Sequence, residues 1–252
     1  MGSAGEAVAG SRGRLNRERV LTTAIELADD SGIGSLTMRR LGEELGVEAM
    51  SLYNHVANKD DLLNGMVDAV FGEIELPSHS DDWKTAMRKR SVSFRATLSR
   101  HPWATTLKDS GTNPGPATLR HHDRVLGTLR NAGFSVAMAA HAFSALDSYI
   151  YGFAMQEKSL PFTSEEETAA MAHILLAQLP VNEYPYLAEL TADHVLQPGY
   201  NYADEFPLGL DLILDGLESR LERQRETPPA DPLQPSVTVE RSSATCVHRL
   251  SL

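Results

Sequence analysis

The sequence has very little cysteine, with only Cys246 in 252 residues. One thiol cannot form a disulfide within the chain or supply a thiolate cage for a metal, so a reducing compartment is expected. Long apolar runs are absent too, because no stretch approaches the roughly 18–20 residues that a membrane-spanning helix requires. The first fourteen residues lack the apolar segment of a signal peptide. We therefore expect a cytoplasmic protein with no membrane partner.

Basic residues are the minority, with 23 lysines and arginines against 34 aspartates and glutamates and a formal net charge of −11. This balance excludes a protein that holds nucleic acid by bulk charge. Residues 12–59 differ from the rest, because their seven basic residues equal their seven acidic ones. Any DNA contact must come from such a local region, and binding should be specific, salt-sensitive and weak on random DNA.

Motifs of catalysis and cofactor binding are also missing. The sequence contains no Glu-x-x-His, Gly-x-Ser-x-Gly, Gly-Lys-Ser/Thr or Cys-x-x-Cys. His121, His122 and Asp123 are the best remaining metal candidates, but adjacent helical residues point about 100° apart and cannot converge on one ion. We predict no enzymatic activity, no cofactor and no metal, with a helical-bundle metalloenzyme as the distant alternative.

Helical periodicity runs through most of the chain, and no segment has the alternation of a strand. Asn16 and the pair Ser31-Gly32 mark the start and end of a first helix, and five or six further helices follow between residues 82 and 225. We predict an all-α fold in four regions: a flexible basic arm (1–15), a three-helix domain (16–75), a larger helical domain (76–226) and a disordered tail rich in proline and serine (227–252).

Residues 36–63 have the spacing of a helix-turn-helix. Leu41 and Leu45 lie one turn apart before Gly46, where a left-handed residue is wanted, and Leu52 and Val56 repeat the spacing after it. A second helix pinned on one side leaves its other side free to enter a major groove. The positions on that free side are Ala49, Met50, Ser51, Asn54 and His55. Other helical pairs share this spacing, so by itself it leaves DNA binding open.

The same segment closely resembles the DNA-binding domain of the tetracycline-repressor (TetR) family of regulators. The motifs that carry the resemblance are Gly32, Leu36-Thr37-Met38-Arg39-Arg40-Leu41-Gly42, Gly46-Val47, Leu52-Tyr53-Asn54-His55-Val56 and Asn58-Lys59-Asp60-Asp61-Leu62-Leu63. Residues 206–221 resemble, more weakly, the last dimer helix of the tetracycline-repressor branch, and the middle of the chain matches poorly. The resemblance implies an N-terminal DNA-binding domain and a C-terminal domain for effector binding and dimerisation.

Carried over by position, the resemblance implies which residues meet double-stranded operator DNA. Tyr53, His55 and Lys59 would contact phosphates, Arg39 would also reach DNA, and Ser51 and Asn54 would face base edges. Such donors fix register on the backbone, and Asn can read adenine with two hydrogen bonds. Ala49 and Met50 depart from the polar residues of some relatives, which favours contact with thymine methyl groups. The alternatives are packing of Tyr53 against the first helix and a solvated helix start at Lys59.

The family's other functional part is a ligand cavity in the C-terminal domain. We place it among apolar walls, an inward histidine and one face of an apolar helix: Phe94, Leu98, Trp103, Leu107, His122, Leu126, Ser144, Asp147 and Tyr151. His122 is expected inward with Leu119, Leu126 and Leu129, and His121 outward; a core position for His122 is the alternative. The Asp147 carboxylate needs a partner, either a ligand or a hydrogen bond across a dimer.

A small reading domain of this kind works in pairs, so we predict a homodimer. Its interface would lie on the last helix, with Gly209 and Gly216 allowing close approach and residues 136–158 completing a four-helix contact. The interface residues are Phe206, Leu210, Ile213, Leu214, Leu217 and Leu221, with Leu208 and Leu212 beside them. The alternative for this stripe is ordinary core within one chain.

These features predict a ligand-responsive repressor that binds palindromic operator DNA as a homodimer and is released by an unknown small molecule. The helix that begins at Asn58 would be the lever between effector and DNA. Tetracycline itself is not expected, because no histidine precedes the turn Gly111-Thr112-Asn113-Pro114, as one does in the tetracycline repressors. The alternative is a regulator that binds DNA constitutively or activates transcription.

Overall fold

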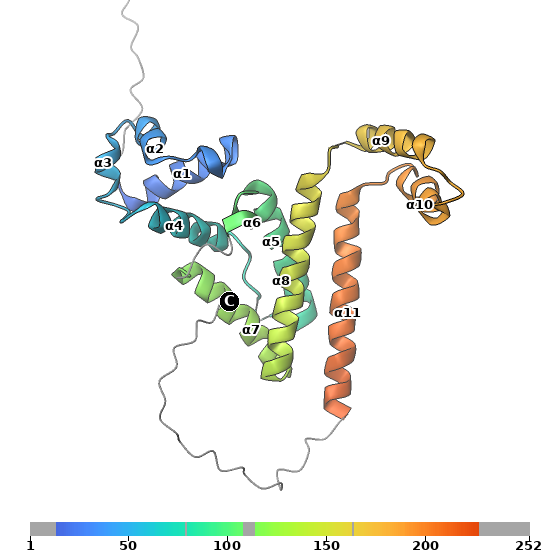
Figure 1. Cartoon of the computed structure of the whole chain (residues 1–252). Helices are drawn as coiled ribbons and strands as arrows, with labels where there is room; N and C mark the ends of the chain where they lie inside the picture. The colour runs from blue at the N-terminus through green and yellow to red at the C-terminus, as the bar shows by residue number, and fades with distance from the viewer. Residues whose placement is uncertain (1–13, 79, 108–113, 163, 227–252) are drawn as a thin grey trace, which may run out of the picture. The chain divides into compact units, whose positions relative to one another are not determined.

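The computed structural model describes residues 14–78, 80–107, 114–162 and 164–226 (Figure 1). The regular elements in these ranges are all helices, so the predicted all-α fold is confirmed. The predicted tail, all but the last two residues of the predicted arm, and most of the turn at 111–114 lie outside the described residues. Among the helices described, none is long and apolar enough to cross a membrane.

The described residues form two compact units, one from those within 1–76 and 93–124 and the other from those within 77–92 and 125–252. Two helices, α5 (Trp83–Arg100) and α7 (Pro116–Asn131), contribute part of their length to each unit. Each unit is described below by itself.

The first unit begins with the helices of the predicted DNA-binding domain. The predicted caps Asn16, Thr37 and Asn58 each accept a hydrogen bond from the backbone N–H three residues later, at 2.8, 3.1 and 2.8 Å. These caps fix where three of the helices begin. The elements are α1 (Arg17–Ser31), a 3₁₀ turn η1 (Ile33–Ser35), α2 (Met38–Leu45), α3 (Ala49–Leu52) and α4 (Lys59–Gly72).

A polar cluster joins the C-terminal ends of α1 and α4 to the segment before α6 (Ala104–Leu107). The ring nitrogens of His101 lie 2.9 Å from Asp29 and 3.2 Å from Glu73, and the indole N–H of Trp103 donates to Asp29 at 2.6 Å. Burial disfavours the Glu73 carboxylate, but hydrogen bonds from Arg100 and His101 outweigh it, so the pKa of Glu73 lies below its ordinary value. The cluster therefore holds the far end of α4 by charged hydrogen bonds.

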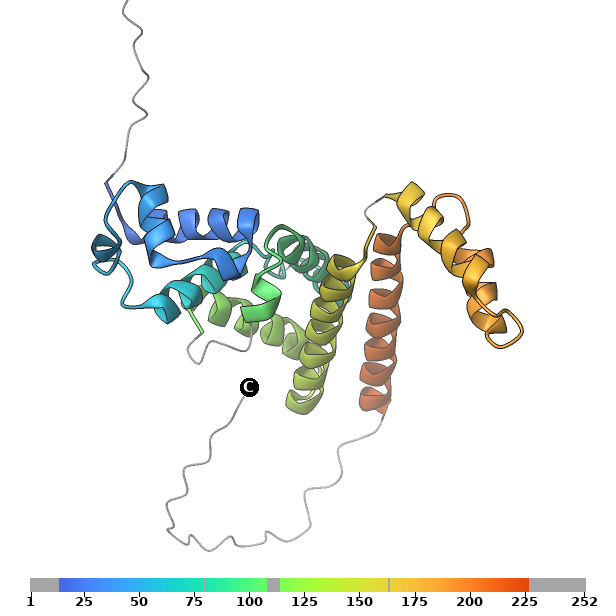
Figure 2. The ribbon, with the colours of Figure 1, turned by 45° about the horizontal axis from the view of Figure 1, so that its top comes forward.

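The second unit is built around two long antiparallel helices, α8 (Val136–Ser159) and α11 (Glu205–Glu226), which lie side by side in Figures 1 and 2. The Tyr149 hydroxyl donates to the carbonyls of Glu205 and Phe206. A Cβ at Gly209 would lie 2.2 Å from that hydroxyl, so the glycine admits Tyr149 of the same chain. The expectation that Gly209 serves approach to a second subunit is therefore wrong.

Between α8 and α11 the chain forms a separate helical segment. The predicted helix around residues 186–195 is present as α10 (Pro185–Leu190), which continues into a π-helical turn, η2 (Thr191–Val195). The remaining elements of this segment are α9 (Glu165–Gln178) and the 3₁₀ turn η3 (Tyr202–Asp204).

Candidate nucleic-acid interface

Two glycines build the turn between α2 and α3. Gly46 has φ +69°, the left-handed conformation that favours glycine, and this confirms the role predicted for it. A Cβ at Gly42 would lie 2.9 Å from the carbonyl oxygen of Val47 and 3.1 Å from the amide nitrogen of Ala49. The two helices thus meet through their backbones, which is what a helix-turn-helix requires.

The second helix of the motif is shorter than the spacing predicts, because α3 ends at Leu52 and residues 53–55 form a turn. Together, α3 and this turn are pinned on one side and open on the other. Leu52 and Val56 are buried, as the spacing predicts. On the opposite side Met50 is 73% exposed, Asn54 is exposed, and Ala49, Ser51 and His55 are partly exposed. Short polar and apolar groups on an open helix are the chemistry that reads base edges in a major groove.

The predicted phosphate contacts surround this face. Tyr53 is 43% exposed, so its ring is not buried against α1. Lys59 is exposed at the first residue of α4, where helix-end N–H groups also favour an anion. The Arg39 side chain is 88% exposed and donates to Glu43 one turn later at 2.9 Å. These side chains are accessible to DNA, and their contacts with it stay predictions.

The expected orientation of the two adjacent histidines is wrong. His121 is fully buried, with its ring 5.5 Å from Phe71 and 5.8 Å from Phe94 between centroids, whereas His122 is partly exposed. Leu119 and Leu126, which were expected inward, are 54% and 37% exposed. Leu129 is buried as expected, but the other buried positions of α7, Thr118, His121 and Val125, are each one residue before the expected ones.

The partner of Asp147 is neither a ligand nor a second subunit. The guanidinium of Arg90, on α5, donates to the Asp147 carboxylate at 2.6 Å, and the two side chains are 0% and 7% exposed. Both residues belong to the second unit. Arg90 was not selected from the sequence because α5 contains many basic residues. The signal that could have identified it is its place on the buried stripe of α5, with Met87, Ser91 and Phe94.

The other predicted pocket residues divide between the units. Phe94, Leu98 and Trp103 are buried in the first unit, and Leu107 is partly exposed there. In the second unit Tyr151 is buried, whereas Ser144 is exposed although it lies three residues before Asp147 on the same helix. Ser144 lies roughly a third of a turn from the middle of the buried stripe of α8. The grouping of these residues into one effector pocket stays a prediction.

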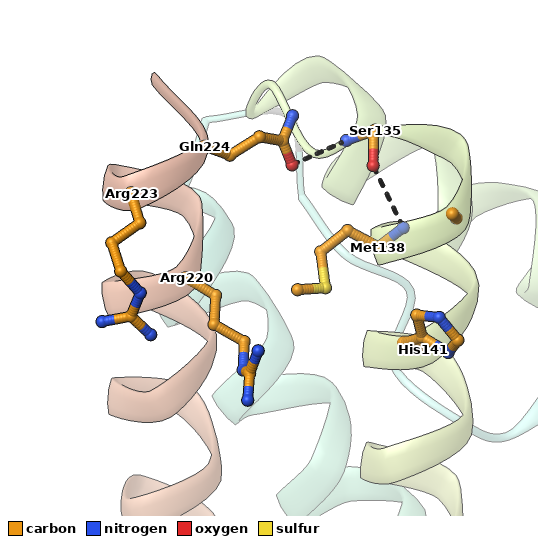
Figure 3. Close-up of a pocket in the computed structure, with 7 residues that line it drawn as sticks. Ser135, Met138, His141, Arg220, Arg223 and Gln224 are labelled. Carbon is orange, nitrogen blue, oxygen red and sulfur yellow. Dashed lines mark hydrogen bonds between the residues drawn. The ribbon is translucent and has the colours of Figure 1, made fainter. Parts of the chain in front are cut away.

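An open cavity of about 430 Å³ lies between the start of α8 and the end of α11 (Figure 3). Ser135 caps α8, and its own N–H faces the side-chain oxygen of Gln224 at 3.4 Å. None of the lining residues was predicted to line a pocket. The feature of the sequence that could have indicated the cavity is the group of arginines at the end of the last helix. The lining residues are Ser135, Ala137, Met138, His141, Arg220, Arg223 and Gln224.

Comparison with known families decides the identity of the chain. Residues 20–66 match the model of bacterial regulatory proteins of the tetR family, and residues 76–221 match that of the tetracyclin repressor-like C-terminal domain. The chain belongs to the TetR family. It is therefore a DNA-binding transcriptional regulator with a helix-turn-helix, from a family without enzymatic activity. The described residues contain no group of three or more histidine, cysteine and acidic side chains that could hold a metal.

Individual TetR-family relatives support the assignment over most of the chain. The HTH-type transcriptional repressor DrrR1 of Streptomyces coeruleorubidus is 32% identical over 225 residues, which cover 86% of this chain and 82% of the relative. Apo ActR of Streptomyces coelicolor superposes with a TM-score of 0.71 at 26% identity, covering 83% and 98% of the two chains. ActR in complex with actinorhodin gives 0.69 at 28% identity, covering 82% and 99%.

The stripe predicted as the dimer interface of this TetR-family chain is core. Its members Phe206, Leu210, Leu214, Leu217 and Leu221 are between 0% and 7% exposed within the single chain, and Ile213 is partly exposed. The alternative of an ordinary core is therefore the correct one. The residues noted beside the stripe are the open ones, because Leu208 and Leu212 are 63% and 76% exposed.

Proposed function

We propose that the chain is a cytoplasmic, homodimeric repressor that binds a palindromic operator and is released by a small-molecule effector. The observation that carries the proposal is α3 with the turn after it, pinned by Leu52 and Val56 and open on the other side at Met50 and Asn54. DrrR1 is a repressor by name, and ActR has been solved with a small molecule bound, which supports the same function for this relative.

The lever between effector and DNA would be α4. It begins with Lys59 at the proposed DNA face, and Glu73 at its end is tied to Arg100 and His101. Midway, the Asp68 carboxylate accepts hydrogen bonds from the N–H of Thr118 at 2.8 Å and of Ala117 at 3.3 Å, at the start of α7. An effector that disfavours this arrangement by about 1.4 kcal/mol would weaken operator binding tenfold.

Substitution Lys59→Ala is expected to weaken operator binding and flatten its salt dependence. Each subunit would lose one phosphate contact, so a dimer should lose about two from the slope of log affinity against log salt. Fluorescence anisotropy at several salt concentrations measures this, with an operator selected from a random duplex pool by the wild-type protein. Lys158→Ala, an equal charge loss at an exposed site on α8, should leave the slope unchanged. An unchanged slope for Lys59→Ala would contradict the proposed DNA face.

A constitutive or activating regulator is the second candidate. Adding actinorhodin, the ligand of ActR, and related small molecules to the protein–operator complex separates the two. Release by a compound supports effector control, whereas a complex that resists all of them favours constitutive binding.

The dimer would form on surfaces that the single chain leaves open. On α11 these are Leu208 and Leu212, and on α8 Val136 and Met155 are 70% and 55% exposed. The segment of α9 and α10 adds a run of apolar side chains that are at least 42% exposed. They are Met171, Ile174, Leu175, Val181, Tyr184, Tyr186, Leu187 and Leu190. An open apolar surface of this extent is typical of an interface.

Substitution Leu212→Glu is expected to weaken self-association by roughly a hundredfold. A two-fold interface would bury the new carboxylate twice, without a partner. Sedimentation velocity across a concentration series gives the dimer dissociation constant. The matched control is Val92→Glu, which places the same charge at a 50% exposed site on α5 and should leave the dimer intact. A wild-type protein that stays monomeric at micromolar concentration would refute the interface.

A further inference from the structure

An ion pair closes the turn that follows α3. The Arg17 guanidinium, at the first residue of α1, donates to both carboxylate oxygens of Asp61, at 2.7 and 2.9 Å. It also donates to the backbone carbonyl of His55 at 2.9 Å. Planar two-point pairing of this kind fixes geometry as well as charge. Arg17 thus holds the end of the α3 turn and the first turn of α4 at once.

Asp61 completes the closure from the other side. Its carboxylate accepts the backbone N–H of Ala57 at 2.8 Å, and its own N–H donates to the cap Asn58. The hydrogen bonds from Arg17 and from the Ala57 backbone hold the pKa of Asp61 below its ordinary value. The backbone from His55 to Ala57 is therefore bound at both ends to the same ion pair.

The surrounding packing leaves room for this pair. A Cβ at Gly65, one turn further along α4, would lie 2.8 Å from the Leu21 side chain and 3.1 Å from a guanidinium nitrogen of Arg17. A larger residue there would displace Leu21 or Arg17. The glycine thus lets α1 approach α4 closely enough for the guanidinium to reach Asp61 and His55.

We infer that Arg17 and Asp61 are positioning residues for operator recognition, because their ion pair sets where Tyr53, His55 and Lys59 meet the DNA. The residues predicted to touch DNA lie within the closed turn or directly beside it, and the ion pair joins this turn to α1. The inference rests on the proposed DNA face.

Charge alone predicts the opposite effect of removing Asp61. An acidic group next to a phosphate-binding surface repels DNA, and its loss would also free Arg17 to bind a phosphate, so Asp61→Asn would tighten binding. A positioning role predicts weaker binding to the operator, because the neutral amide holds Arg17 less firmly and the turn loosens. The sign of the change therefore separates the two explanations.

The test compares operator and scrambled duplex for Asp61→Asn at fixed salt. We expect affinity for the operator to fall at least tenfold while affinity for the scrambled duplex stays equal or rises, so that the specificity ratio collapses. Glu43→Gln is the matched control, since it removes the same charge from the Arg39–Glu43 pair on α2 and should leave operator affinity equal or higher. Equal or tighter operator binding by Asp61→Asn would overturn the inference.

Arg17→Ala and the double variant complete the cycle. If the residues act as one unit, Arg17→Ala should lose as much specificity as Asp61→Asn, and the double variant should be no worse than the poorer single one. Arg17→Lys should recover part of the loss. A loss with Arg17→Ala alone would make Arg17 a phosphate contact and refute positioning. Lys59→Ala distinguishes the failures: if it also has no effect, the DNA face itself is misplaced. Circular dichroism confirms that each variant is folded.

Discussion

Substitution Asp147→Ala is expected to destabilise the protein by about 3–5 kcal/mol, the usual cost of removing one partner of a buried ion pair. The Arg90 side chain is 0% exposed, so its charge would stay buried without the carboxylate that accepts its hydrogen bond at 2.6 Å. Chemical denaturation followed by circular dichroism gives the free energy of unfolding.

Two controls separate burial from the mere loss of an ion pair. Asp81→Ala breaks the exposed pair with Lys89, where the side chains are 20% and 52% exposed, and should cost less than about 1 kcal/mol. Replacing both partners, Arg90→Met with Asp147→Leu, should recover most of the stability, because no charge then remains buried. If Asp147→Ala unfolds at the wild-type denaturant concentration, the carboxylate is not what compensates the buried guanidinium.

Substitution Gly42→Ala is expected to abolish most of the specific affinity for the operator, by at least about a hundredfold. The new Cβ would lie 2.9 Å from a backbone carbonyl and 3.1 Å from a backbone nitrogen, neither of which can rotate away. Such overpacking costs roughly 1–3 kcal/mol and moves α3 relative to α2. Specific binding exceeds non-specific binding by roughly 10³ or more, and a displaced α3 forfeits that margin.

The matched control for Gly42→Ala lies in the same domain. A Cβ at Gly34 would meet no atom within 4 Å, and the φ of this glycine is not positive, so Gly34→Ala should leave both affinity and stability unchanged. Operator affinity by anisotropy and the midpoint of thermal unfolding are the two measurements. Retention of wild-type affinity by Gly42→Ala would mean that the approach of α2 and α3 does not set the reading face.

The reading domain is predictable because its determinants are local. Asn16, Thr37 and Asn58 cap helices through side chains three residues from their partners, and Gly46 supplies a left-handed turn. Each of these features depends on a few neighbouring residues. A single sequence therefore contains the information needed to place the helix starts and the turn.

The C-terminal domain is harder to predict because its determinants are distant pairings. Arg90 and Asp147 are 57 residues apart, and nothing in the local pattern around Asp147 names its partner. In α7 the exposed leucines Leu119 and Leu126 mimic an inward face, and the buried one carries His121 instead. On α11 the apolar stripe is real, but periodicity cannot tell whether a helix of the same chain or of another copy covers it.

Asp68 connects α4 to the start of α7. Its carboxylate acts as the capping group of α7, although the two are about fifty residues apart in the sequence. A Cβ at Gly115 would lie 2.2 Å from that carboxyl group, so only glycine lets the incoming chain come this near. The N–H groups in the first turn of α7 are thus capped by a side chain of another helix, α4. A shift of α4 that moved Asp68 away would therefore remove the cap and let the first turn of α7 fray.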